Sequence, residues 1–207
     1  IIAPVLANLP PATVNVSCAE NVPAMPNPAV TATDNCGQPI DIYFSEVEIP
    51  GTCSNQYQIT RTWRAQDDCG NATTFVQTIT INDNVAPVLA NLPAASVTVE
   101  CSQQVPAVAA VTVSDNCNKP IDLDFSEVEI PGTCPNQYVI TRTWRASDDC
   151  GNSTSFVQTI TVSDTKAPVF AGLPPATVDV VCASDVPAVA NVTATDNCGA
   201  PIDVELS

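Results

Sequence analysis

The chain has 207 residues, with 22 Asp and Glu against 6 Lys and Arg and a formal net charge of -16. This charge argues against nucleic acid or an anionic membrane surface as a partner, because phosphate contacts need clustered Lys and Arg. The 10 Cys, with no His, favour disulfide bonds in an oxidising compartment, and no apolar run approaches the roughly 20 residues of a membrane-spanning helix.

Segments of alternating apolar and polar residues follow one another along the chain. In order, they are Thr13–Cys18, Ala29–Asp34, a segment with Ile40, Ile42 and Phe44 on one face, a segment with Tyr57, Ile59, Trp63 and Ala65 on one face, and a segment with Phe75, Ile79 and Ile81 on one face. This period of two predicts β-strands with one buried and one wet face. Arg61 falls on the Trp63 face, so we expect its guanidinium to reach a carboxylate at the margin of the core.

The same pattern recurs with its cysteines. Residues 39–80 match residues 120–161 at all but seven positions. The sequence therefore predicts three repeats, 1–83, 84–164 and 165–207, of which the last is the N-terminal half of a unit cut from a longer array. Five or six strands in about 81 residues predict an all-β fold of tandem, disulfide-bonded, immunoglobulin-like β-sandwich domains arranged end to end.

Strand direction predicts which cysteines lie together. If successive strands alternate in direction, Cys36 and Cys69 lie at one end of the first sandwich, and Cys18 and Cys53 lie at the other. Spacing alone allows three connectivities per repeat, and this topology favours Cys36–Cys69 with Cys18–Cys53. In the second repeat the corresponding pairs are Cys117–Cys150 and Cys101–Cys134.

Four segments together carry a resemblance to a known family. Val30–Cys36, Tyr57–Trp63, Asp67–Asn71 and Thr80–Pro87 resemble the HYR-like, immunoglobulin-like repeats of large bacterial surface proteins. The resemblance covers the whole chain and implies secreted, cell-surface arrays in adhesion or extracellular fibres. The linker Asn82–Asn84 also resembles the calcium linker of cadherins, although the fuller cadherin pattern is missing.

Acidic residues gather where the predicted topology joins one repeat to the next. We expect Asp83 to meet Asp115, Asp148 and Asp149 across the first junction, and Asp164 to meet Asp196 across the second. Carboxylates that converge without a nearby Lys favour a hard cation, and Ca²⁺ tolerates irregular oxygen coordination best. The predicted metal ligands are Asp34, Asp67, Asp68, Asp83, Asn84, Asp115, Asp148, Asp149, Asp164 and Asp196, with Glu46 and Glu48 as possible additions.

An alternative for these clusters is ordinary turn capping, because Asp and Asn accept hydrogen bonds from their own backbone. Catalysis is not expected, since a chain without His cannot build a His-based triad and no Gly-rich phosphate loop is present. We expect a structural shaft that is secreted, attached to a cell surface and self-associated into fibres or bundles. The competing hypotheses are a module that binds glycan or protein, and a filament subunit completed by a neighbour's strands.

Overall fold

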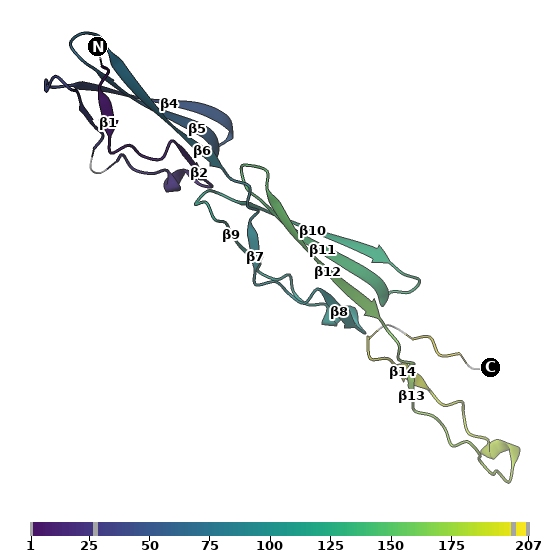
Figure 1. The fold of residues 1–207 in the computed structure, drawn as a ribbon. Helices are drawn as coiled ribbons and strands as arrows, with labels where there is room; N and C mark the ends of the chain where they lie inside the picture. Colours follow the sequence, from purple (N-terminus) through teal and green to yellow (C-terminus); the bar gives the residue numbers. More distant parts are fainter. Residues whose placement is uncertain (1, 27–28, 200–201, 206–207) are drawn as a thin grey trace. The chain divides into compact units, whose positions relative to one another are not determined.

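The structure is a computed structural model that describes residues 2–26, 29–199 and 202–205. The outer ends of the predicted first and third repeats, at residue 1 and residues 206–207, lie outside this description. The described chain is all-β apart from three short 3-10 turns, which confirms the predicted fold class (Figure 1). None of the helices in these residues has the length and apolar character that crossing a membrane requires.

The described residues of the first repeat form six strands and one 3-10 turn. They are β1 (Val5–Ala7), β2 (Thr13–Val16), η1 (Ala19–Asn21), β3 (Thr31–Thr33), β4 (Asp41–Cys53), β5 (Gln56–Gln66) and β6 (Ala72–Asn82). The second repeat follows the same order. Its elements are β7 (Val88–Ala90), β8 (Ser96–Val99), η2 (Ser102–Gln104), β9 (Thr112–Ser114), β10 (Asp122–Pro131), β11 (Gln137–Ser147) and β12 (Ser153–Ser163). The described part of the third holds β13 (Val169–Ala171), η3 (Ala183–Asp185) and β14 (Thr193–Thr195).

Each full repeat pairs a four-stranded sheet with a two-stranded one. In the first repeat the order is β2-β6-β5-β4, with β2 parallel to β6 and the other neighbours antiparallel, while β1 pairs with β3 antiparallel. The second repeat has the orders β10-β11-β12-β8 and β7-β9. These directions confirm the predicted alternation, so the loops after β2 and β4 lie at one end of the repeat and those after β3 and β5 at the other.

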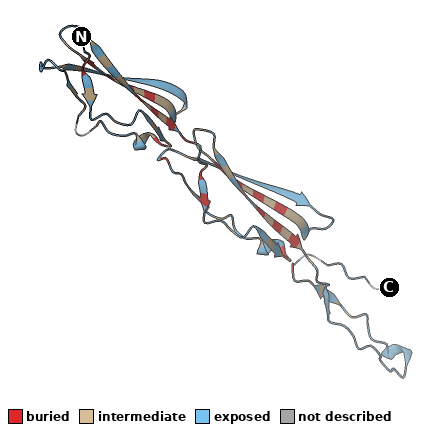
Figure 2. Ribbon diagram, viewed as in Figure 1, coloured by how far each residue is buried: buried red, intermediate tan, exposed pale blue. Residues whose placement is uncertain are grey.

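The core lies on one face of the two central strands. Ile59 of β5 packs with Ile79 and Ile81 of β6, as the alternation predicts. Burial is concentrated on β5 and β6 and on their counterparts β11 and β12, while β4 is mostly exposed (Figure 2). The prediction of a buried Phe44 is wrong, because β4 is an edge strand and most of its side chains are left exposed. Phe44 still contacts Trp63, with 5.2 Å between ring centroids, but remains 45% exposed.

Arg61 reaches a carboxylate, as predicted, but it is buried within this apolar face and not at its margin as expected. Its Nε donates to Glu46 Oε2 at 2.6 Å, and its Nη1 donates to the Pro23 carbonyl at 2.9 Å. Glu46 therefore sits in mid-strand opposite Arg61 and is not at the junction where the sequence placed it. Arg142 and Glu127 repeat the pair in the second repeat, also at 2.6 Å.

The buried arginine predicts a measurable stability loss. Arg61→Ala removes both hydrogen bonds and leaves the Pro23 carbonyl without this donor, which should cost about 2 kcal/mol of unfolding free energy. Arg64→Ala on the same strand is the control, because Arg64 is exposed and should cost less than about 0.5 kcal/mol. Urea unfolding of both variants measures the difference, and equal losses would contradict the assignment of Arg61 to the core.

The contacts divide the chain into two compact units that cut across the repeats. Unit 1 contains Ile1–Ala90, Val111–Asp124 and Arg145–Ser155, and unit 2 contains Asn91–Ala110, Phe125–Trp144 and Phe156–Ser207. One end of the second repeat thus packs with the first repeat, inside unit 1. We call the place where the first repeat meets that end the first junction. Its counterpart inside unit 2, where residues 91–110 meet the start of the third repeat, is the second junction.

Candidate functional site at the repeat junctions

The cysteines of each repeat are named by their order along it. The first-position cysteines are Cys18, Cys101 and Cys182, the second-position are Cys36, Cys117 and Cys198, the third-position are Cys53 and Cys134, and the fourth-position are Cys69 and Cys150. First-position cysteines follow β2 or its counterpart, and third-position cysteines lie at or just after the end of β4 or its counterpart. Both lie at the end of a repeat that leads to the next. Second-position cysteines follow β3 or its counterparts, and fourth-position cysteines follow β5 or its counterpart. Both lie at the opposite end of the repeat.

The disulfides at the first junction join one repeat to the next. Cys18 is bonded to Cys117, with 5.3 Å between Cα atoms, and Cys53 is bonded to Cys150, with 5.1 Å. A first-position cysteine therefore pairs with a second-position cysteine, and a third-position with a fourth-position, each time in the following repeat. Cys18 and Cys117 are 1% and 2% exposed, so this bridge is sealed from solvent.

The second junction repeats the first of these bridges. Cys101 is bonded to Cys198 with 5.1 Å between Cα atoms, and both residues are buried. The remaining cysteines, Cys36, Cys69, Cys134 and Cys182, are exposed and form no disulfide within the described chain.

The predicted pairing inside each repeat is wrong, although the predicted ends are right. Cys18 follows β2 and Cys53 ends β4, and these strands are opposite edges of one four-stranded sheet, about 14 Å apart at the usual strand spacing. A disulfide needs Cα atoms within about 7 Å. Cys36 and Cys69 are both exposed and unbonded in the described chain. The counterpart pairs Cys101–Cys134 and Cys117–Cys150 are also wrong, because Cys101, Cys117 and Cys150 are bonded to cysteines of neighbouring repeats.

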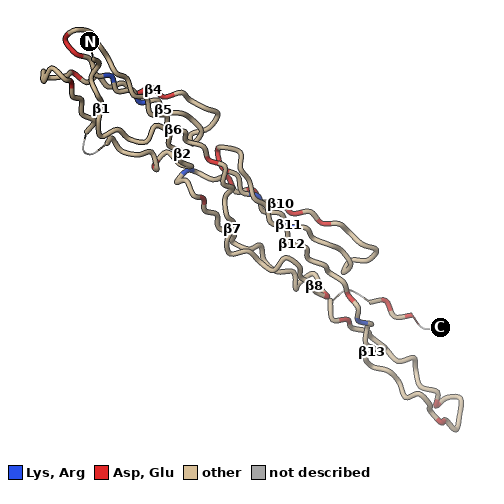
Figure 3. The backbone as a smooth tube through the Cα atoms, in the orientation of Figure 1, with Lys and Arg blue, Asp and Glu red and all other residues tan. Residues whose placement is uncertain are grey.

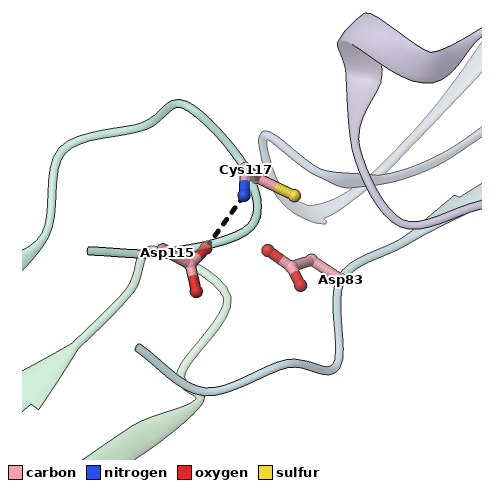
Figure 4. A group of neighbouring side chains, drawn as sticks. All are labelled: Asp83, Asp115 and Cys117. Carbon is pink, nitrogen blue, oxygen red and sulfur yellow. Dashed lines mark hydrogen bonds between the residues drawn. The ribbon is translucent and has the colours of Figure 1, made fainter. Parts of the chain in front are cut away.

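Two of the predicted carboxylates converge beside the first bridge. Ligand atoms of Asp83, Asp115 and Cys117 lie within 4.8 Å of one another (Figure 4). Asp83 is 6% exposed and its Oδ1 accepts from the Val85 backbone N–H at 3.2 Å. The side-chain amide of Asn116 has one terminal atom 3.4 Å from Asp83 Oδ1 and the other 3.1 Å from Asp115 Oδ1. Cys117 is oxidised in the bridge, so the charge here comes from the two carboxylates.

The second junction brings together Asp164, Asp196 and Cys198 in the same way. The expectation of no nearby Lys is wrong here, because Lys166 lies beside this cluster and contacts Glu100 at 2.8 Å. The hydrogen bond and charge of Glu100, with smaller effects of Asp164 and Asp196, raise the pKa of Lys166. Lys and Arg are few along the chain and are outnumbered by Asp and Glu (Figure 3).

The other predicted ligands have separate hydrogen-bonding roles. Asp148 caps its own turn, accepting from the backbone N–H groups of Cys150 and Asn152 at 2.9 Å each. Asp67 does the same in the first repeat, and its hydrogen bond from the Asn71 amide is the largest effect that lowers the pKa of Asp67. For these two residues the turn-capping alternative describes the contacts. Asp34 accepts from the Cys36 backbone N–H at 3.2 Å.

Asp149 contacts the preceding repeat instead of the carboxylate pair. It accepts from the Ser54 hydroxyl at 2.5 Å and from the Ser54 backbone N–H at 3.2 Å, and these bonds lower the pKa of Asp149. Glu20 likewise accepts from the Asn118 backbone N–H at 3.0 Å. Asp68 and Asn84 are exposed. Sequence reasoning missed Ser54, Glu20 and Asn116, whose only signal was their position one or two residues from a cysteine.

Comparison with known proteins adds a family to this geometry. A family model described as an HYR-like domain with 4 cysteines matches residues 7–81 and again residues 90–162. The two matched segments correspond to the first two sequence repeats and include all of their cysteines. No curated protein matches the chain.

Proposed function

The chain belongs to the family of HYR-like domains with four cysteines, and on this premise we propose that it is the non-catalytic shaft of an extracellular surface fibre or adhesin. Tandem HYR-like domains and abundant disulfides indicate extracellular, adhesion-type repeats. The observation that carries the finer proposal is that the bridges run between repeats. A sandwich that needed only its own stability would be served by bridges inside it, whereas bonds between repeats transmit load along the chain.

The polar contacts of the junctions support the same role. Ser54 with Asp149 and Glu20 with Asn118 add hydrogen bonds beside the bridges of the first junction. Two repeats that are joined both by disulfides and by charge-assisted hydrogen bonds have little freedom to rotate relative to each other. A shaft needs this resistance to bending, while a set of independent binding modules does not.

We further propose that Ca²⁺ occupies the carboxylate pair at each junction. Calcium lies 2.3–2.6 Å from its oxygen ligands, so one ion can contact two carboxylate oxygens that are up to about 5 Å apart. The ligand atoms of Asp83 and Asp115 meet this limit, and the Asn116 amide oxygen and water supply further oxygen donors. Zinc does not fit, because the chain has no His and the sulfur of Cys117 is oxidised.

The proposal predicts a calcium-dependent, extended particle. Calcium at about 100 times its dissociation constant stabilises the folded protein by about 2.7 kcal/mol for each site. The melting temperature in calcium should therefore be about 5–10 °C higher than the melting temperature in chelator. Small-angle X-ray scattering of the oxidised protein in calcium should report an elongated particle. A compact particle would contradict the shaft, and a melting temperature that ignores chelator would contradict the calcium site.

Asp→Asn variants inside and outside the junction test whether the calcium response arises at the carboxylate pair. Asp83→Asn keeps an oxygen for the Val85 N–H but removes one ligand charge, so it should lose most of the calcium response, as should Asp115→Asn. Asp41→Asn makes the same change of charge on exposed β4 and should respond to calcium like the parent. If all three variants respond alike, calcium acts through general charge screening and not at the junction.

A further inference from the structure

A row of side chains crosses the outer face of the four-stranded sheet in the first repeat, which is the face turned away from the core. From edge to edge it consists of Asn15 of β2, Thr80 of β6, Gln58 of β5 and Ile49 of β4, which the strand pairing sets side by side. The adjacent residues of β5 and β6 form the core, so the row points to solvent, because side chains alternate along a strand. At the usual strand spacing the row is about 14 Å long.

Two shallow hollows lie along this row and meet at Thr80 and Asn82. The first, of about 290 Å³, lies toward β2 and is also lined by Asn15, Ser17 and Asn84. The second, of about 300 Å³, lies toward the hairpin between β4 and β5 and is also lined by Gln56 and Gln58. Every polar side chain that lines these hollows is an amide or a hydroxyl.

The lack of charge in the hollows decides which class of ligand they fit. The chain has 22 Asp and Glu against 6 Lys and Arg, yet among the described residues none of these lines either hollow. A metal ion would find no carboxylate there, and the net charge of -16 would repel an anion. Amide and hydroxyl side chains together donate and accept hydrogen bonds, as the hydroxyl groups of a neutral sugar also do.

The hydrogen-bonding groups of the row are available to a ligand. Within the described part of the chain, the side chains of Asn15, Gln58 and Thr80 make no hydrogen bond. Asn82 Oδ1 accepts from Gln56 Nε2 at 3.5 Å, which leaves the amide nitrogen of Asn82 available. A ligand can therefore bind along the row without breaking contacts that the fold needs.

The second repeat has a corresponding hollow with fewer of these groups. It has a volume of about 410 Å³ and lies at the hairpin between β10 and β11. In its lining Val139 stands where the first repeat has Gln58, and Ser163 stands where the first repeat has Asn82. The hollow is thus common to both repeats, while these two amides belong to the first alone.

We propose that the outer face of the first repeat binds a neutral oligosaccharide along the row from Asn15 to Gln58, with Asn82 as a further partner. Sugar hydroxyls donate to the amide and hydroxyl oxygens and accept from the amide nitrogens. The row is longer than one pyranose ring, so the ligand is a chain of sugars. A second copy of this chain is disfavoured, because two chains of net charge -16 repel each other. The site adds a carbohydrate contact to the proposed shaft.

An NMR titration of the whole isotope-labelled chain tests the site directly, because the side-chain amides of Asn15, Gln58 and Asn82 give signals of their own. The neutral probes are hexasaccharides of glucose, galactose, mannose and N-acetylglucosamine at millimolar concentration, and the acidic probe is a hexasaccharide of galacturonate. At least one neutral probe should shift these three amide signals until they saturate, and the acidic probe should leave them unchanged.

Substitutions taken from the second repeat locate the contact and are compatible with the fold. Gln58→Val and Asn82→Ser each introduce the residue that the second repeat has at that position. Each removes an amide that makes about one hydrogen bond, so each should weaken sugar binding roughly fivefold. Gln66→Ser is the matched control, because it introduces the counterpart Ser147 at the far end of β5. Gln66 lies about 27 Å along the strand from Gln58, so this variant should bind like the parent.

Several results would overturn this inference. If no neutral probe shifts the three amide signals, the row is an ordinary wet face of the sheet. If Gln58→Val and Asn82→Ser bind sugar as tightly as the parent, the sugar binds elsewhere. Equal binding of the acidic probe would contradict the ligand class, and signals that respond only to protein concentration would show contact with another copy. None of these results changes the particle shape or the calcium response, so failure here is distinct from failure of the shaft proposal.

Discussion

Pulling the oxidised chain from its two ends should extend it far less than pulling the reduced chain. The Cys18–Cys117 bridge spans a sequence separation of 99, and the Cys101–Cys198 bridge spans 97. While a bridge is intact, force passes through its sulfur atoms and the residues between never become taut. The two bridges overlap between residues 101 and 117, so together they keep all but these residues of the segment 18–198 out of the force path. An extended residue adds about 3.3–3.6 Å, so reduction should release roughly 500 Å of chain. Single-molecule force spectroscopy with and without reductant measures this release.

The control for this experiment removes the bridges without reductant. Cys18→Ser combined with Cys101→Ser should show only part of the added length when oxidised, because the remaining Cys53–Cys150 bridge still spans a sequence separation of 97, and adding Cys53→Ser should release the rest. Bridges confined to single repeats, such as Cys18–Cys53, would span only about 35 residues each and give a much smaller gain on reduction. A gain of roughly 200 Å in place of roughly 500 Å would therefore contradict the bonds between repeats.

The strand pattern was predictable because it depends on local alternation. Ile59, Ile79 and Ile81 form a core with period two in the sequence and in the structure. Even Arg61, which breaks the apolar face, has its explanation in the pairing of β4 with β5, which sets Glu46 directly opposite. Phe44 was mispredicted because alternation does not reveal which strand is at an edge and thus left uncovered.

The disulfide partners needed information that alternation does not contain. Strand direction places Cys18 and Cys53 at the same end of the repeat, and this is confirmed. Strand order separates them, because β6 and β5 lie between β2 and β4. The order depends on the parallel pairing of β2 with β6, a contact between residues more than 60 positions apart. Direction was therefore inferable from the sequence, and adjacency was not.

The carboxylate cluster was half predictable for a related reason. The repeat and the short linker bring Asp83 near the start of the next repeat, so its meeting with Asp115 follows from topology. Asp148 and Asp149 are adjacent in sequence, yet one caps its own turn and the other reaches Ser54 of the preceding repeat. Neighbouring residues in a turn point in different directions, and only the local backbone decides which one faces the junction.

Cutting the linker should leave the two parts of the oxidised chain joined. Asn84 and Val85 are exposed, so a protease recognition site inserted between them should be cleaved. Cys18–Cys117 and Cys53–Cys150 then hold the fragments together, and a non-reducing gel should show one band that splits into two only with reductant. Free thiols are alkylated first, so that no bridge forms or shuffles after cleavage.

Serine variants make the outcome quantitative. Cys18→Ser or Cys53→Ser alone should keep the cleaved fragments joined through the remaining bridge, while the double variant should release them without reductant. Bridges within repeats, as Cys18–Cys53 with Cys36–Cys69, would instead let the parent fragments separate at once after denaturation. Release of the parent fragments without reductant would thus show that the repeats are not covalently joined.

The same serine variants should also lower the stability of the uncleaved protein. Closing a loop of about 100 residues stabilises the native state by about 4.7 kcal/mol in the chain-entropy model. Each single variant should therefore also melt below the parent, and the double variant lower still.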